Sequence, residues 1–225
     1  TDQSNFKQNC VPRGSPPGSR ASSGCARSWG CAAHKFDGSP RPPRPIMPLP
    51  VAENILAQTV VATRPNETWV TDITYVPTAK GWQYLAGIKD LFTCEVVDPA
   101  MGGRMTTDSV IQALGIAVWV KRPRPGLLHH SDRGAQYCAQ AYQDQLRQFG
   151  MTASMRRKGN CYDNAPMESV WGPLKNELVH HRCYDTREIT ESIEMFYNRQ
   201  RRHSRLGKCS PAALALQWAR QESAA

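Results

Sequence analysis

Hydrophobic positions between residues 69 and 155 fall into short runs that predict an alternation of strands and helices. Three β-rich runs come first, and the segment 78–81 between the first two has the composition of a hairpin turn. Segments with helical and strand-like periodicity then alternate. The expected strands are 69–76, 82–88, 93–97, 127–130 and 151–155, and the expected helices are 107–121, a helix around 142–149, 163–179 and 187–198.

This order, β-β-β-α-β-α-β-α, predicts an α/β fold with a mixed five-stranded sheet and helices on both faces. It is also the order of the RNase H-like fold. The flanking regions differ from the core, because Pro, Gly and Ser fill 21 of the first 50 positions. The expected parts are an irregular low-complexity region at 1–48, a linker at 49–65, the RNase H-like core at 66–180 and a helical, basic C-terminal extension at 181–225.

Composition narrows the expected partners and the compartment. The net charge of +9 suits a polyanion such as DNA, RNA or an anionic membrane surface. No apolar stretch is long enough to span a membrane and the first ten residues lack a signal-peptide core, so a cytoplasmic protein is expected. Two loose Cys/His groupings, 25–34 and 180–183, match known zinc spacings poorly, which favours scattered free thiols.

Three carboxylates stand where metal chemistry would need them. Asp72 lies inside an apolar strand, Asp132 directly follows a buried strand, and Glu168 lies on the helix after the fifth strand. Strand ends and a facing helix can converge on one point, where three carboxylates would repel each other unless cations were bound. Hard oxygen ligands suit Mg²⁺ or Mn²⁺, and two such ions perform phosphoryl transfer. Solvated surface acids are the alternative, and it is strongest for Glu168 alone.

Basic and polar residues near these acids are candidates for DNA contacts. Lys175 follows Glu168 by two helical turns and Asn164 precedes it by one, so the three share a helix face. Lys175 would contact a phosphate near the metal ions. Further along, Arg199, Arg201, Arg202 and Arg205 form a run without an acid among them. A solvated helix end explains that run about as well as a phosphate-positioning patch.

Five segments together resemble a known family of enzymes. The segments are WVTDITY (69–75), HHSDRGAQY (129–137), KGNCYDNAPMES (158–169), YNRQRRHS (197–204) and SPAA (210–213). They are similar to the bacterial insertion-sequence transposases of the IS-three family, in the product of the second reading frame (OrfB). The resemblance covers roughly residues 50 to 220. The resemblance extends to the retroviral integrases, which share two Asp residues and a Glu. In those enzymes 35 residues separate the second Asp from the Glu, and here residues 133–167 separate Asp132 from Glu168.

The resemblance implies an activity and a set of partners. Asp72, Asp132 and Glu168 would be the catalytic triad that holds two Mg²⁺ or Mn²⁺ ions, and Lys175 the basic residue that follows it. The enzyme would cleave DNA at transposon ends and transfer the 3′-hydroxyl to a second phosphodiester. Expected partners are transposon-end and target DNA, a helix-turn-helix protein from an upstream reading frame and further copies of the chain, all at the bacterial nucleoid. The alternatives are a degraded remnant that binds DNA without catalysis and a stand-alone metal-dependent nuclease.

Two prolines stand where the family pattern does not have them. Asp98-Pro99 replaces a Gly-aromatic pair at the end of the expected third strand, where proline removes a donor from the ladder. Pro173 falls between Glu168 and Lys175 and removes a helix hydrogen bond to the Ser169 carbonyl. The sequence therefore predicts a kink in this helix, and the kink would re-aim Lys175.

Overall fold

The described part of the chain folds around one mixed β-sheet. The computed structural model describes residues 51–57, 61–157, 165–179 and 184–224. The strands are β1 (Thr68–Thr78), β2 (Gly81–Asp90), β3 (Val96–Gly102), β4 (Leu128–Ser131) and β5 (Thr152–Met155). Their order in the sheet is β3-β2-β1-β4-β5, in which β1 to β3 form an antiparallel meander and β4 and β5 continue it in parallel with β1. The predicted five-stranded mixed sheet is confirmed.

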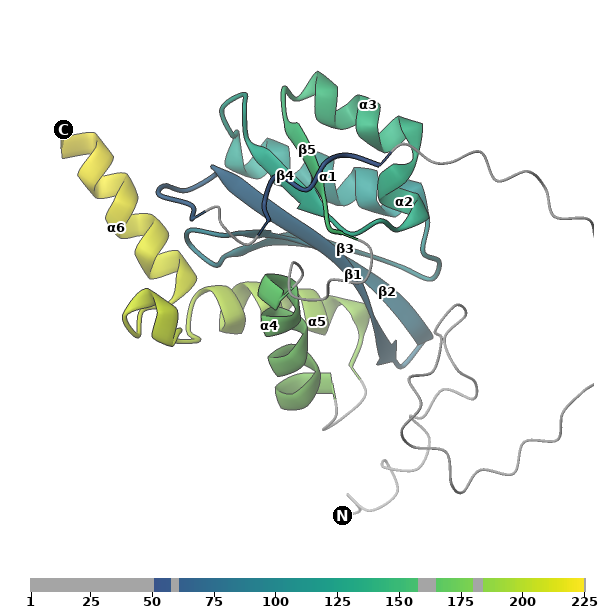
Figure 1. The fold of residues 1–225 in the computed structure, drawn as a ribbon. Coiled ribbons are helices and arrows are strands. Elements are labelled where there is room, and N and C mark those ends of the chain that lie inside the picture. Colours follow the sequence, from purple (N-terminus) through teal and green to yellow (C-terminus); the bar gives the residue numbers. More distant parts are fainter. Residues whose placement is uncertain (1–50, 58–60, 158–164, 180–183, 225) are drawn as a thin grey trace, which may run out of the picture.

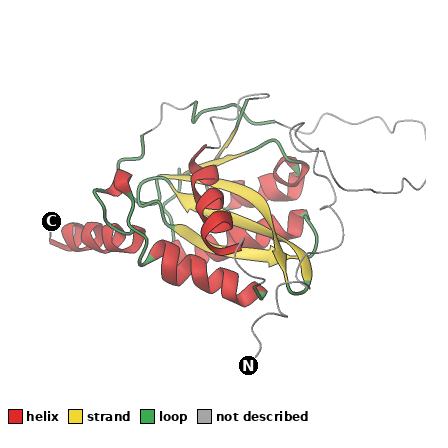
Figure 2. Ribbon diagram, turned by 90° about the horizontal axis from the view of Figure 1, so that it is seen from below, coloured by secondary structure: helices red, strands yellow, loops and turns green. Residues whose placement is uncertain are grey.

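Helical segments cover both faces of this sheet, as predicted. They are α1 (Thr107–Lys121), α2 (Ala135–Cys138), α3 (Gln140–Gln148), α4 (Ala165–Pro173), η2 (Leu174–Val179), α5 (Thr186–Glu191), η3 (Ser192–Asn198), η4 (Ser204–Leu206) and α6 (Pro211–Ala224). Figure 1 shows α1, α2 and α3 on one face and α4 and α5 on the other. The C-terminal α6 leaves the body of the domain, which Figure 2 shows from below. No helix in the described ranges is long and apolar enough to cross a bilayer.

The third strand lies later in the sequence than predicted. It begins at Val96 rather than Thr93 and runs through Pro99. The register with β2 shifts between Ala86 and Ile88, which pair with Ala100 and Val97, so two residues of β3 face one residue of β2. Proline fits there because β3 is an edge strand and the bulge needs no donor from the ring nitrogen.

The predicted helix over 163–179 is α-helical only in part. α4 ends at Pro173 and the chain continues as the π-helix η2. Proline lacks the N–H that would bond the carbonyl four residues earlier, so the α-helical pattern cannot continue through this point. The last predicted helix, 187–198, is likewise divided into the α-helix α5 and the π-helix η3. An Asp185–Glu188 capping box begins α5.

Two apolar clusters lie on opposite faces of the sheet. Trp69 is fully buried on the side of α1 and α3, whereas Val70 is buried on the side of α4 and η3. This alternation follows from the period of a strand. Asp72 shares the parity of Val70, so it belongs to the face that α4 covers.

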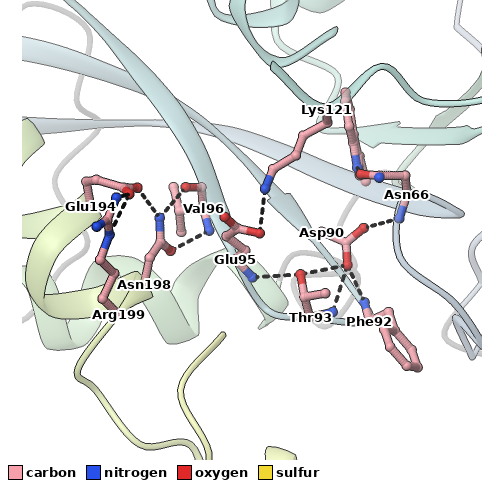
Figure 3. Close-up of polar contacts among 11 residues, drawn as sticks. Asn66, Asp90, Phe92, Thr93, Glu95, Val96, Lys121, Glu194, Asn198 and Arg199 are labelled. Atoms are coloured by element: carbon pink, nitrogen blue, oxygen red, sulfur yellow. Dashed lines mark hydrogen bonds and ion pairs between the residues drawn. The ribbon is translucent and has the colours of Figure 1, made fainter. Parts of the chain in front are cut away.

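The C-terminal extension is tied to the edge strand by one amide side chain. Asn198 Oδ1 accepts from the Val96 backbone N–H at 2.9 Å, and Asn198 Nδ2 donates to the Val96 carbonyl at 2.8 Å. Figure 3 shows this pair beside the Lys121–Glu95 ion pair, which links α1 to the segment before β3 over 2.6 Å. The same view shows Asp90 accepting the backbone N–H groups of the turn between β2 and β3. The first two links hold segments far apart in the sequence against β3.

The segment predicted as a linker lies along the opposite edge of the sheet. Ile55 and Leu56 donate their backbone N–H groups to Ser154 Oγ at 3.0 and 3.3 Å. The Met155 N–H donates to the Glu53 carbonyl at 3.2 Å. Leu56 is buried in the apolar cluster under α4. The region predicted as low-complexity, 1–48, lies outside the described residues.

Candidate active site

Asp72 and Asp132 belong to the two neighbouring central strands. β1 and β4 pair in parallel with Thr68 opposite Leu128, Trp69 opposite His129 and Val70 opposite His130. Each partner is 60 residues further along the chain, and Asp132 has the same offset from Asp72, two residues beyond the last of these pairs. Asp132 is the first residue beyond β4, and neighbouring strands lie about 4.8 Å apart. The fold therefore brings these two predicted carboxylates to the same end of the central strand pair.

The phenol of Tyr137 gives independent support for this closeness. Burial raises the pKa of Tyr137 well above its usual value, and the charges on Asp72 and Asp132 raise it further. Tyr137 is fully buried, and its hydroxyl lies 3.2 Å from Thr71 Oγ. The charges of both carboxylates thus affect the pKa of one hydroxyl group, which lies beside Thr71 of β1.

A tight turn holds the Asp132 carboxylate over its own backbone. Gly134 N–H donates to Asp132 Oδ1 at 2.8 Å, and a Cβ at position 134 would lie 2.9 Å from that oxygen. A larger residue at position 134 would require this carboxylate oxygen to move. The Arg133 side chain donates to the Arg156 carbonyl at 2.7 Å, which ties the turn to the chain beyond β5.

Asp72 is linked to the helix that carries Glu168. Trp171 Nε1 donates to Asp72 Oδ2 at 3.1 Å. Glu168 lies three residues before Trp171, in the first turn of α4, and its side chain is exposed. Within the described ranges, however, no three His, Cys, Asp or Glu side chains converge closely enough to hold a metal ion. The structure thus places Asp72 on β1 and Asp132 directly after the neighbouring strand β4, and Glu168 on the helix whose Trp171 bonds Asp72.

A buried lysine fixes the first turn of α4 on the sheet. Lys89 Nζ donates to the Pro166 carbonyl at 2.9 Å and to Ser169 Oγ at 3.1 Å. Burial lowers the pKa of Lys89, the Cys94 thiol opposes this shift, and the nearby Arg205 guanidinium adds to it. The two acceptors flank Glu168 in the sequence. The Lys89 ammonium group therefore positions the first turn of α4, which carries Glu168, against β2. A lysine inside an apolar strand was the sequence feature that could have pointed to this contact.

Lys175 stays beside Asp72 despite the change of helix type at Pro173. Its Nζ lies 4.6 Å from the centre of the Tyr75 ring. Burial lowers the pKa of Lys175, while the negative charge of Asp72 opposes the shift. The predicted effect of Pro173 on the helix is therefore seen as a switch to π-helix, and the lysine still extends over β1.

The other predicted DNA-contact residues differ in their surroundings. Arg199 donates to Glu194 at 2.8 Å, and Arg201 is paired with Glu177. The arginine run therefore has acids beside it in space, although it has none within its sequence. Arg202 and Arg205 are exposed, and Asn164 lies outside the described residues.

The sequence is similar to integrase core domains and to proteins of bacterial insertion elements. Residues 62–161 match the family described as "Integrase core domain", and residues 149–211 match a second family with the same description. The "Insertion element IS600 uncharacterized 31 kDa protein" of Shigella sonnei is 59% identical over 170 residues, which cover 73% of this chain and 62% of that protein. The "Transposase InsF for insertion sequence IS3A" of Escherichia coli (strain K12) is 46% identical over 169 residues, which cover 72% and 58%. The chain thus spans about three fifths of the length of these relatives.

Solved structures show the same fold at low sequence identity. The HTLV-2 integrase catalytic core domain in complex with magnesium, in its dimeric form, matches with a TM-score of 0.54 and 17% identity, over 67% of this chain and 96% of that one. A chain of the simian T-cell lymphotropic virus intasome matches with a TM-score of 0.61 and 16% identity, over 76% and 60%. These likenesses establish the RNase H-like integrase architecture.

Proposed function

The chain belongs to the integrase core domain family, together with the transposases of IS3-type insertion sequences, and we propose that it is the catalytic part of such a transposase. Its reaction would be metal-dependent cleavage of DNA at the ends of its element, followed by transfer of the freed 3′-hydroxyl to a second phosphodiester. The observation that carries this proposal is the 60-residue offset between β1 and β4 at Thr68–Val70, which, if continued by two residues, would set Asp72 beside Asp132. The identity to InsF supports the same conclusion.

Asp72, Asp132 and Glu168 would hold two divalent cations. The donor set fits Mg²⁺ or Mn²⁺, because it consists of carboxylates on or beside neighbouring strands, and hard oxygen ligands suit these ions. Glu168 would complete the set from the first turn of α4, which Lys89 and Trp171 hold against the sheet. Two such ions, when bound, would activate the attacking oxygen and stabilise the leaving oxygen.

The side chains around the carboxylates would position DNA rather than react with it. In cleavage, a water oxygen bonds to phosphorus while the bond from phosphorus to the 3′-oxygen breaks, and that oxygen takes up a proton. In transfer, the 3′-oxygen bonds to a second phosphorus, and the displaced oxygen takes the proton. No enzyme nucleophile is required. Lys175, beside Asp72, would hold a phosphate oxygen during both steps.

The partners follow from this activity. Arg202 and Arg205 are exposed and would contact the DNA backbone beyond the metal site. Recognition of the transposon ends would involve a helix-turn-helix partner from an upstream reading frame and additional copies of the chain. The reaction would take place on bacterial DNA at the nucleoid.

Replacing Glu168 by Gln tests the proposal, since the amide keeps the shape of the side chain and removes its charge. With labelled duplexes that carry the DNA flanking the coding sequence, cleavage in Mg²⁺ should fall by more than about a hundredfold, beyond the loss typical of outer-shell changes. DNA affinity measured without metal should be retained, because it rests on cations that contact phosphates.

Glu222→Gln on the exposed α6 is the matched control and should cleave as the unchanged protein does. Unimpaired cleavage by Glu168→Gln would contradict the assigned role. A full chain that binds DNA but cleaves in neither Mg²⁺ nor Mn²⁺ would identify a degraded remnant. Cleavage without joining would identify a stand-alone nuclease.

A further inference from the structure

The indole of Trp171 lies directly on the backbone of β2 at Gly87. A Cβ added to Gly87 would lie 2.6 Å from Cη2 and 3.0 Å from Cζ2 of the indole, and 3.6 Å from Met167 Cε. These distances leave no room for any other residue at position 87 unless the indole moves. Gly87 is the cross-strand partner of Asp72 in the β1–β2 register. The large ring therefore rests on β2 beside the strand position that carries the carboxylate.

The polar edge of this buried ring meets Asp72. Trp171 is 5% exposed, and its Nε1 donates to Asp72 Oδ2 at 3.1 Å. A buried indole N–H needs an acceptor, and a carboxylate has about four lone-pair positions on two oxygens. This N–H bond therefore orients one oxygen of the Asp72 carboxylate toward α4.

We propose that Trp171 is a positioning residue for the metal site and that position 87 must be glycine to leave space for its indole. The inference rests on the proposed function, in which Asp72 and Glu168 bind the same pair of ions. Trp171 follows Glu168 by three residues on α4, close to one helical turn. One side chain thus fixes the carboxylate on β1 and docks the helix that carries the other carboxylate. Partners that orient metal ligands typically change metal affinity 10- to 100-fold when they are removed.

Trp171→Phe in the full chain tests the hydrogen bond, because phenylalanine keeps an aromatic ring and has no N–H. The probe is Mn²⁺ alone, with the dissociation constant measured by calorimetry in the absence of DNA. Mn²⁺ affinity should fall by about tenfold. The Mg²⁺ concentration that gives half-maximal cleavage should rise by a similar factor. The matched control is Trp119→Phe, at an indole that is 75% exposed on α1, and it should leave both values unchanged.

A double-variant cycle separates this role from simple packing. Gly87→Ala alone should displace the indole, weaken Mn²⁺ binding about as much as Trp171→Phe and lower the melting temperature. In the Trp171→Phe background, Cη2 and Cζ2 of the indole are absent, so Gly87→Ala should have almost no further effect on either quantity. Additive losses would overturn the assignment, because they would mean that Gly87 and Trp171 act independently.

The remaining outcomes distinguish this inference from the proposed function. Asp72→Asn should abolish Mn²⁺ binding at the site. If Asp72→Asn has no effect, the metal site lies elsewhere, and both the proposed function and this inference fail. If Asp72→Asn abolishes binding while Trp171→Phe lowers only the melting temperature, Trp171 is a packing residue and the inference alone is wrong.

Discussion

The two faces of the sheet are built from different kinds of contact. On one face α1, α2 and α3 are α-helical, and they bury an aromatic cluster in which Tyr142 packs edge-on against Tyr137 at 5.4 Å and bonds His129 Nε2 at 2.8 Å. On the other face, polar side chains reach from helix to sheet, as Trp171 does to Asp72. The contacts on the first face are mainly aromatic and apolar. On the second face, hydrogen bonds also hold charged side chains beside the apolar cluster of that face.

Helix geometry differs between the faces in the same sense. Both helices that cover the second face change from α to π, at Leu174 and at Ser192. The two π segments lie together, because Arg201 beyond η3 pairs with Glu177 in η2. π-helical turns are rare, and they are often found at functional sites. The irregularity is therefore concentrated on the face that carries the candidate metal ligands.

The first face should be sensitive to acid through His129. Burial lowers the pKa of His129 from 6.5 to about 3, and the neighbouring His130 adds to this shift. The unfolded chain therefore binds a proton first as the pH falls, and stability present above pH 6.5 is lost between 6.5 and 3. The loss at pH 4.5 should be about 3 kcal/mol. Urea unfolding at pH 7 and 4.5 measures it, and His129→Gln should lose that much less than the unchanged protein. Equal losses in both proteins would show that His129 is already protonated or exposed.

The second face should be sensitive to loss of the Asn198 amide. Asn198→Ala would leave the buried backbone N–H and carbonyl of Val96 without their partners, at a cost of about 2 kcal/mol. Chemical denaturation measures the change. Asn176→Ala, at an exposed position in η2, is the control and should change stability by less than about 0.5 kcal/mol. If the two variants were equally stable, η3 would not depend on this contact.

The smallest expected effect is on DNA affinity, when two arginines are removed from one face of the sheet or from the other. Replacing Arg202 and Arg205 together by Ala should weaken binding to duplex DNA of arbitrary sequence about tenfold and reduce the salt slope by about 2. The control removes the same charge from the first face through Arg124→Ala and Arg147→Ala. Filter binding across a range of salt concentrations compares the two. A larger loss in the control would place the DNA on the opposite side of the molecule.

The sequence predicted the parts of this fold that depend on local pattern. The strand of Asp72 was predicted because residues 69–76 form a β-rich run, and helix α1 because residues 107–121 have helical periodicity. The start of β3 was predicted three residues early, because the bulge opposite Gly87 depends on pairing with β2. The Trp171–Asp72 contact joins residues 99 positions apart. Such contacts follow from how α4 packs, which local periodicity does not contain.

The domain boundaries and the triad stay predictions for different reasons. Residues 1–48 and Asn164 lie outside the described ranges. Glu168 lies in the first described turn of α4, directly after such a gap, so its distance to the other two carboxylates rests on the proposal rather than on a contact. Asp132 directly follows β4, whose register with β1 is defined by three residue pairs.

The amide of Asn198 has a consequence for how copies of this protein behave together. An outer strand with open N–H and carbonyl groups is a template on which another chain can add, and this is a common route to aggregation. At Val96 the amide occupies both groups in the way that a sixth strand would. At the far side of the sheet, the Glu53 carbonyl and the N–H groups of Ile55 and Leu56 cover β5. At these positions the edges of the sheet are occupied by the same chain, so they are closed to pairing with the sheet of another copy.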